Sequence, residues 1–401
     1  MSVRPVEHSG GRCMRYTYRL RVSALAQTAL LVEWDRCRWV WNQCVAASRR
    51  AHAAGEICGA AALDKRLTGW RAEHEWLQAG ASVPHQQVIR DFAKSRAKAL
   101  KDIKNRVPIH RRAGLPEFKK KHVAAPTLNY NRNGFKLKDG RLFLSKGVVA
   151  RPVWSRPLPG HPSSVRVYRD SLGHWYASFV VAAQTEQLPA TSKAVGVDWG
   201  VRQIATTTSD DHDLPHPQHG KIAAANLARY QRMMARRRTP KGQPRSRRYR
   251  NAARLAAKAH KKAKRQRQHT ARVWAKKVVI DFDRIAVEDF QPKFLAKSTM
   301  ARKAADAAIK TTKTELMNMA AKHGRHVVLI DPKHSTTDCG TCGTRTKDRL
   351  PLSQRTYTCA FCGHTADRDK NAAQVILNRA GLNPAGADGI RPGAAKPRRA
   401  A

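Results

Sequence analysis

The sequence predicts an α/β protein in which a region of short strands with helical insertions precedes a region where helices alternate with apolar strands. The chain has 401 residues, which is enough for two to four folded units. A sharply apolar strand at 194–199 follows a polar stretch at 183–193, and this change predicts a domain boundary. Beyond that boundary, strand and helix periodicities alternate along the chain, which is typical of a sheet covered by helices.

The first half is predicted to contain a strand, two amphipathic helices and a set of short strands. Residues 16–22 alternate between apolar and polar side chains, which predicts a strand. A helix is predicted over 25–53 because apolar side chains recur there at helical spacing, at Leu30, Trp34, Cys37, Trp41 and Val45. A second helix is predicted over 85–107, where Pro84 suits the N-terminal start. Short strands separated by glycine and proline are predicted at 135–137, 141–144, 165–168 and 175–181. We therefore expect an N-terminal β unit that carries a helical insertion.

The second half, from residue 194, is expected to form one sheet of mixed strand directions. Strands at 194–199 and 203–208 come first, and long basic helices follow them. The remaining predicted elements are a strand at 284–290, a helix at 299–323, a strand at 327–331 and a closing helix at 370–379. This order is the one expected of the ribonuclease H fold. The tail after Gly381 is rich in Gly, Pro, Ala and Arg, so we expect it to be disordered.

The net charge predicts a protein that binds nucleic acid. Lys and Arg number 77 against 29 Asp and Glu, which gives a formal charge of +48 and a pI near 11.0. A protein this basic needs a polyanionic partner. A membrane surface is the competing polyanion, but the sequence has no apolar run of about 18 residues and no long amphipathic segment with an aromatic face. Nucleic acid is therefore the expected partner, and no membrane partner is expected.

The basic residues are concentrated between residues 221 and 277. This segment carries 21 Lys and Arg, and no acidic residue occurs from 214 to 280. A turn with Pro and Gly at 239–244 divides it, and regular Leu and Ala spacing on both sides favours helices. The favoured interpretation is a basic helical hairpin, and the alternative is a solvated face or a disordered arm.

Four of the eight cysteines predict a structural zinc site. Cys339-x-x-Cys342 and Cys359-x-x-Cys362 are separated by sixteen residues, which is a spacing typical of a four-thiolate zinc ribbon. A glycine follows each pair and allows the backbone to turn around the metal. A redox-active pair is the alternative, although two pairs at this separation favour one closed zinc site.

The remaining sequence features around the cysteines carry less information. His334 and His364 flank the cluster and are alternative zinc ligands. Cys37 and Cys44 lie seven residues apart on the apolar side of a predicted helix, which predicts a buried structural role. The first residues contain no apolar signal segment, so we expect a reducing, cytoplasmic setting.

Carboxylates are scarce in this chain, and three groups of them lie on or beside predicted elements. Asp198 lies inside an apolar strand, Glu288 and Asp289 close another strand, and Asp367 and Asp369 begin a helix. Each group alone has an ordinary structural explanation: a buried ion pair for Asp198, a solvent contact at a strand end, or a helix N-cap. Together, hard oxygen ligands from three elements of one sheet are what two Mg²⁺ ions need to bind a scissile phosphate. We therefore predict a metal-dependent nuclease, since the sequence offers no compelling Ser-His-Asp or Cys-His arrangement.

These motifs, taken in order over most of the chain, resemble the TnpB (OrfB) proteins of bacterial insertion sequences, which are related to the type V CRISPR effector nucleases. The early segments of the resemblance are Tyr16-Thr17-Tyr18-Arg19-Leu20, Cys37-Arg38-Trp39-Val40-Trp41-Asn42, Pro116-Glu117-Phe118-Lys119-Lys120 and Trp175-Tyr176-Ala177-Ser178-Phe179. The late segments are Gly196-Val197-Asp198-Trp199-Gly200, Val287-Glu288-Asp289-Phe290, both Cys-x-x-Cys-Gly units and Asp367-Arg368-Asp369-x-Asn371-Ala372-Ala373. The early segments are individually weak, whereas the ordered late set is highly specific.

The resemblance implies a fold and a site. The catalytic domain would be RuvC-like, its three acids would be Asp198, Glu288 and, in the third motif, Asp369 rather than Asp367, and a zinc ribbon would be inserted before the last acid. Trp199 departs from the smaller aliphatic residue that the family often carries, and this removes no ligand. The implied domains are a nucleic-acid-binding β and helical region at 1–183, a linker at 184–193, the RuvC-like domain with its basic hairpin at 194–332, the zinc ribbon at 333–365, the last RuvC segment at 366–380 and a disordered tail at 381–401.

The implied activity is that of an RNA-guided DNA endonuclease. A guide RNA would pair with double-stranded target DNA beside a short motif, two Mg²⁺ ions would serve cleavage, and one Zn²⁺ ion would be structural. A basic channel that holds a heteroduplex by its backbone would explain the charge. Two alternatives remain: a nuclease-silent RNA-guided repressor, whose relatives lose catalytic acids that this chain retains, and a transposase acting directly on DNA ends. We expect a cytoplasmic bacterial protein associated with the nucleoid.

Overall fold

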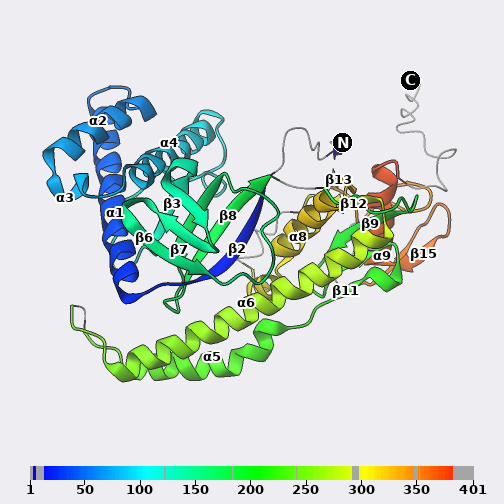
Figure 1. Cartoon of the computed structure of the whole chain (residues 1–401). Coiled ribbons are helices and arrows are strands. Elements are labelled where there is room, and N and C mark those ends of the chain that lie inside the picture. The colour runs from blue at the N-terminus through cyan, green and yellow to red at the C-terminus, as the bar shows by residue number, and fades with distance from the viewer. Residues whose placement is uncertain are drawn as a thin grey trace. The chain divides into compact units, whose positions relative to one another are not determined.

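The protein forms two compact units, which are described separately. The structure is a computed structural model, and it describes residues 3–5, 13–121, 123–182, 185–240, 242–290, 298–346, 351 and 353–382, with only the backbone at 3–5. One unit comprises Gly11–Ala183, and the other comprises Met1–Gly10 together with Gln184–Ala401 (Figure 1). In the described part of the chain, no helix is both long and apolar enough to cross a membrane.

The unit of residues 11–183 is built on an antiparallel sheet of seven strands. Their order is β3-β7-β8-β2-β6-β5-β4. The strands are β2 (Cys13–Arg21), β3 (Thr127–Asn131), β4 (Phe135–Lys138), β5 (Arg141–Leu144), β6 (Val148–Pro152), β7 (Ser164–Arg169) and β8 (Trp175–Ala182). The five strands predicted in this half are confirmed within a few residues. β3 and β6 were not predicted, because β3 contains two asparagines and β6 ends in a proline, and both residue types are uncommon in strands.

Helices are inserted between β2 and β3 in the same unit, as predicted. They are α1 (Ala24–Ala53), α2 (Ala60–Glu73), α3 (Glu75–Gln78) and α4 (Ser82–Lys104). Cys37 and Cys44 are buried in α1, which confirms their structural role. α2 was not predicted, because its N-cap residue, Gly59, has no side chain that could cap the helix and because Gly69 lies in the helix interior.

The second unit contains a mixed sheet of six strands in the order β1-β13-β12-β9-β10-β11, which confirms the α/β class. The strands are β1 (Val3–Pro5), β9 (Ala194–Trp199), β10 (Gln203–Thr207), β11 (Leu214–Pro215), β12 (Arg284–Glu288) and β13 (His326–Ile330). β9, β12 and β13 are parallel to one another, and β10 runs antiparallel to β9. The side chains at 195–199 are buried, as expected of a central strand covered on both faces.

The helices of this unit are α5 (His219–Arg236), α6 (Arg247–Asp281), α7 (Ala301–Ala307), α8 (Ile309–Lys322) and α9 (Arg368–Arg379). α5 and α6 lie side by side as the predicted basic hairpin (Figure 1). The prediction of one helix over 299–323 was wrong, because Ala308 adopts a left-handed conformation (φ 52°) that separates α7 from α8. The carboxylate of Asp306 in α7 caps the start of α5 by accepting from the backbone N–H groups of Gly220 (2.6 Å) and Lys221 (3.1 Å). The predicted disorder after residue 381 falls almost entirely outside the described residues.

Candidate active site and metal centres

Asp198 and Glu288 lie beside each other at the ends of two neighbouring parallel strands. Val197 of β9 is the register partner of Val287 of β12, so the next residues along both strands are adjacent. Both side chains are buried, at 8% and 6% relative exposure, and their carboxyl groups are hydrogen-bonded to each other. Two acids therefore share one buried position.

The surroundings of the two acids oppose their ionisation. Burial raises the pKa of Asp198 well above its usual range, and repulsion from Glu288 and Asp369 raises it further. Burial also raises the pKa of Glu288 to about 7, against the lowering effect of hydrogen bonds with the main chain of Trp199 and with Asp198. A bound divalent cation would favour the charged form of each group. The donor set therefore fits a metal that prefers oxygen ligands.

Asp369 completes the group from α9, which packs directly on β9. A Cβ atom at Gly196 of β9 would overlap the main-chain oxygen of Ala373 in α9, so only glycine permits this close packing. The carboxylate of Asp369 is half-buried in the first turn of α9 and is near enough to raise the pKa of Asp198 by repulsion. It also pairs with the guanidinium groups of Arg355 (3.1 Å) and Arg368 (3.3 Å).

The neighbouring acids of each pair have other partners. Asp289 pairs with the ammonium group of Lys313 at 2.5 Å. The Asp367 carboxylate caps α9 by accepting from the backbone N–H groups of Asp369 (2.8 Å) and Lys370 (3.2 Å). The structure thus pairs Asp198 with Glu288, places Asp369 within electrostatic reach of Asp198, and leaves Asp289 and Asp367 in structural contacts.

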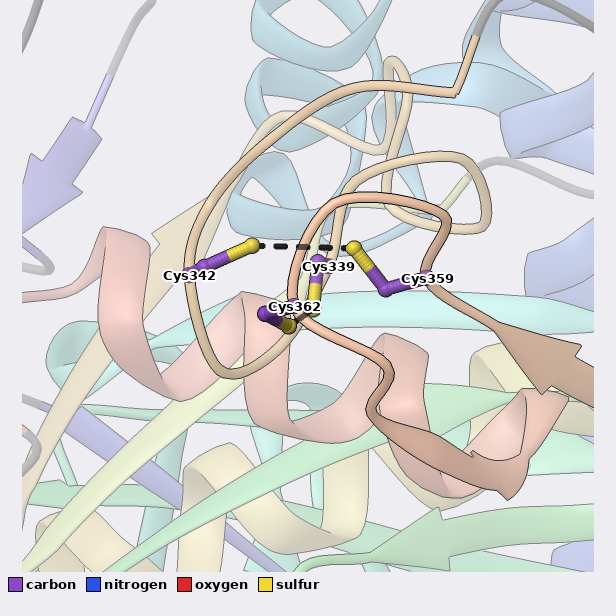
Figure 2. A group of neighbouring side chains, drawn as sticks. All are labelled: Cys339, Cys342, Cys359 and Cys362. Atoms are coloured by element: carbon purple, nitrogen blue, oxygen red, sulfur yellow. Dashed lines mark hydrogen bonds between the residues drawn. The ribbon is translucent and has the colours of Figure 1, made fainter.

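The four cysteines at 339–362 converge on one point (Figure 2). Their sulfur atoms all lie within 4.8 Å of one another, with 3.7 Å between Cys339 and Cys362 and 3.6 Å between Cys342 and Cys359. Four thiolates at Zn–S distances of about 2.3 Å in a tetrahedron would be separated by about 3.8 Å. The cluster therefore has the dimensions of a zinc site.

The two cysteine pairs have the same backbone geometry. We call the turn at residues 339–343 the first knuckle and the turn at residues 359–363 the second knuckle. In the first knuckle, the Gly343 N–H donates to the Cys339 carbonyl at 3.0 Å, and in the second the Gly363 N–H donates to the Cys359 carbonyl at 2.9 Å. Both glycines have positive φ angles, 73° and 71°, as their place after each pair predicted. Main-chain N–H groups of Cys362 and Phe361 lower the pKa of the Cys359 thiol to about 6, which favours the thiolate form that binds metal.

Comparison with known proteins places the chain in a family. Residues 178–299 match the family described as "Probable transposase" (OrfB of IS605), and residues 310–376 match the family described as "Cas12f1-like, TNB domain". A protein of Streptomyces pristinaespiralis named "Putative RNA-guided DNA endonuclease" is 32% identical over 335 residues, which cover 81% of this chain and 79% of that protein. The chain belongs to the TnpB (OrfB) family.

Two further comparisons agree with membership in the TnpB family. A protein of Escherichia coli (strain K12) named "Putative RNA-guided DNA endonuclease InsQ" is 24% identical, and the match covers 91% of this chain and 92% of that protein. A Cas12f1 protein, solved in complex with single-guide RNA and target DNA, superposes with a TM-score of 0.53 at 13% identity, covering 90% of this chain and 83% of that one. The last likeness shows a shared Cas12-like fold.

Several residues beside the acids in this TnpB-family chain were not predicted from sequence. Lys370 places its ammonium group on Asp210 (2.5 Å), Asp213 (2.9 Å) and the Thr207 carbonyl (2.9 Å), which ties the start of α9 to the loop after β10. The indole of Trp199 donates to the main-chain oxygen of Glu288 at 3.1 Å. The partners lie up to 163 residues apart, so no local pattern identifies them.

A second group of potential ligands, Glu33, Cys37 and His85, is buried in the unit of residues 11–183. Hydrogen bonds from Arg36 (3.0 Å) and the Ala81 N–H (3.2 Å) already occupy the Glu33 carboxylate. The guanidinium of Arg71 lies 2.8 Å from Nδ1 of His85. Two guanidinium charges at the group disfavour a further cation, so we interpret it as a structural polar network that connects α1 with α4.

Proposed function

We propose that the chain is an RNA-guided DNA endonuclease of the TnpB type, which cuts target DNA by metal-dependent phosphodiester hydrolysis next to a short motif. The observation that carries the proposal is the buried, mutually hydrogen-bonded pair Asp198 and Glu288 with Asp369 beside it. Oxygen ligands on two neighbouring strands and on the helix that packs on them suit two Mg²⁺ ions. The names of the relatives support the same activity.

The chain's own residues would have defined roles in this reaction. Asp198 and Glu288 would hold the ions from β9 and β12, and Asp369 would hold them from α9. When bound, the two ions would activate a water molecule and stabilise the leaving oxygen of the cleaved bond. Cys339, Cys342, Cys359 and Cys362 would bind one structural Zn²⁺ in a ribbon inserted before the last acid. The surrounding sheet would be a RuvC-like domain of the ribonuclease H class.

The remaining parts would bind nucleic acid. We assign residues 11–183 of the N-terminal region to binding guide RNA and double-stranded target DNA, with a linker at 184–193 before the nuclease domain at 194–332, whose sheet also includes β1. The ribbon would span 333–365, and 366–380 would complete the nuclease domain, with a tail at 381–401. The basic hairpin of α5 and α6 supports this division, since α5 has no buried side chain and presents its Lys and Arg to solvent. Such contacts to the phosphate backbone would leave sequence recognition to base pairing.

The test is cleavage of a plasmid library with randomised flanking sequence by protein co-expressed with its native downstream locus. The wild type is expected to cut beside one enriched flank motif only when Mg²⁺ is present, and Asp198→Ala is expected to abolish cutting. Asp211→Asn is the matched control, because Asp211 is an exposed acid outside the cluster, and it should cut like the wild type. Stable target binding without cutting by the wild type would instead favour a nuclease-silent repressor. Joined DNA ends would favour a transposase.

A further inference from the structure

α9 is held on two opposite sides. One side carries Ala373 and Leu377, which pack on β9 at Gly196. The other side carries Asn371, Gln374 and Asn378, which contact the first zinc knuckle at Gly340. Asp369 lies at the start of the same helix. The position of this carboxylate over the sheet therefore depends on what holds the helix from the knuckle side.

Asn371 makes the central contact on the knuckle side. Its side chain is 1% exposed. Its Nδ2 group donates to the Asp338 carbonyl (2.8 Å), and its Oδ1 accepts from the Gly340 N–H (2.8 Å). An amide offers a donor and an acceptor on one planar group, which is what this stretch of main chain requires. No ionised carboxylate and no apolar side chain could make both bonds.

Further bonds from α9 extend the contact along the same stretch. The Asn378 side chain donates to the Gly340 carbonyl at 2.5 Å. Arg379 pairs with the Asp338 carboxylate at 2.6 Å. A Cβ atom at Gly340 would come within 2.9 Å of Gln374, so the knuckle backbone lies directly on the helix. The two residues that flank Cys339, Asp338 and Gly340, are thus fixed to the helix, and Cys339 is one of the four cysteines.

We propose that Asn371 is a positioning residue that joins the first knuckle to α9 and so fixes the position of Asp369, which determines how tightly the three carboxylates bind Mg²⁺. This inference rests on the proposed function of the acids. A knuckle bonded to α9 would hold the helix on β9 and Asp369 near Asp198. Without these bonds, the start of the helix would keep its contacts through Lys370 and through the arginine partners of Asp369.

The test measures metal binding directly, with Tb³⁺ as a probe for the Mg²⁺ positions. Trp199 follows Asp198 and contacts the main chain of Glu288, so its indole is placed to sensitise Tb³⁺ luminescence at the acids. Full-length, zinc-loaded protein is compared with Asn371→Asp, which keeps the acceptor and loses the donor. Asn378→Ala removes the bond to Gly340 and the bond that Asn378 accepts from Gln374 (2.9 Å). Thr365→Ala is the control, since Thr365 is an exposed hydroxyl of the ribbon with no contact to α9 among its hydrogen bonds.

We expect Asn371→Asp to retain one zinc per chain, to bind Tb³⁺ at least tenfold more weakly and to need correspondingly more Mg²⁺ for cleavage, with activity recovering at high Mg²⁺. Asn378→Ala should weaken Tb³⁺ binding about threefold, and Thr365→Ala should match the wild type. Wild-type Tb³⁺ affinity in zinc-loaded Asn371→Asp would overturn the inference. If that variant loses zinc or fails to fold, Asn378→Ala decides, and an unchanged affinity there overturns it. Asp198→Ala separates the two proposals: unchanged Tb³⁺ binding and cleavage in Asp198→Ala would refute the proposed function itself.

Discussion

The carboxyl groups of Asp198 and Glu288 share a hydrogen bond across two adjacent parallel strands, β9 and β12. A carboxyl group can donate only while it is protonated, so this bond requires one of the two acids to retain its proton. At neutral pH that requirement conflicts with the ordinary ionisation of an aspartate. The two adjacent buried carboxyl groups therefore lower the stability of the metal-free protein, and the same two groups would favour binding of a cation.

The first prediction follows from this conflict. Asp198→Asn replaces one acid by a neutral amide that can still donate to Glu288, so it removes the cost of burying two acids together. We expect the metal-free variant to be more stable than the wild type at pH 7.5 by about 1 to 2 kcal/mol, a rise in Tm of about 2 to 8 °C. Cleavage should be lost. The measurement is thermal unfolding in Mg²⁺-free buffer without a chelator, so that zinc stays bound, and a variant less stable than the wild type would contradict it.

A second prediction concerns pH. The folded-state pKa of Glu288 is raised from 4.5 to about 7, so the folded protein holds a proton that the unfolded chain has released. The stability that this proton provides is complete below pH 4.5 and is lost as pH rises to about 7, because the unfolded state then binds fewer protons. The raised pKa of Asp198 causes a loss in the same direction, and Asp198→Asn removes this contribution while the buried Glu288 is present in both proteins. The difference in Tm between wild type and Asp198→Asn should therefore grow from pH 5 to pH 7.5, and a constant difference would contradict this assignment.

The sequence predicted the elements with strong local patterns and missed contacts that depend on the whole fold. The strand at 194–199 was predicted with its observed bounds, because the run is apolar apart from Asp198, as expected of a strand that is buried on both faces. The break at Ala308 has no glycine or proline to indicate it, so one helix was predicted where two exist. The contact between Asn371 and Gly340 is equally invisible in sequence, since it depends on how the knuckle packs on α9. Spacing did predict the cysteine cluster, because both pairs are local and the metal geometry restricts their separation.

A third prediction tests the packing of α9 on the sheet. Gly196→Ala places a methyl group where the main chain of Ala373 lies, so α9 must move away from β9. We expect a loss of about 2 to 3 kcal/mol of stability and little or no cleavage, because Asp369 moves with the helix. Gly160→Ala is the matched control, since no atom lies within 4 Å of the added methyl group there. Equal Tm and cleavage in the two variants would show that the close packing is unimportant.

A fourth prediction concerns the cysteine cluster. Cys342→Ser and Cys359→Ser each remove one of four thiolates, so the bound zinc should fall from one per chain to substoichiometric amounts, with a lower Tm. Cys13→Ser changes an exposed cysteine of β2 and serves as the control, with zinc content and Tm unchanged. Atomic emission spectrometry and a thiol titration measure the zinc bound per chain. Full zinc content in both ribbon variants would exclude the four-thiolate site.

The last prediction concerns the basic hairpin. Arg254, Lys258 and Lys262 are exposed and lie four residues apart on α6, so they share one face of the helix. If this face contacts phosphates, each residue neutralised should reduce the slope of log affinity against log salt by about 0.7 to 0.9. The triple substitution Arg254→Gln, Lys258→Gln and Lys262→Gln should therefore reduce the slope by about 2 to 3, with weaker binding of all sequences and an unchanged Tm. The matched control is Asn251→Ala with Gln266→Ala, two uncharged exposed positions on the same helix. An unchanged slope in the triple variant would mean that the charge of this face serves solubility and that nucleic acid binds elsewhere.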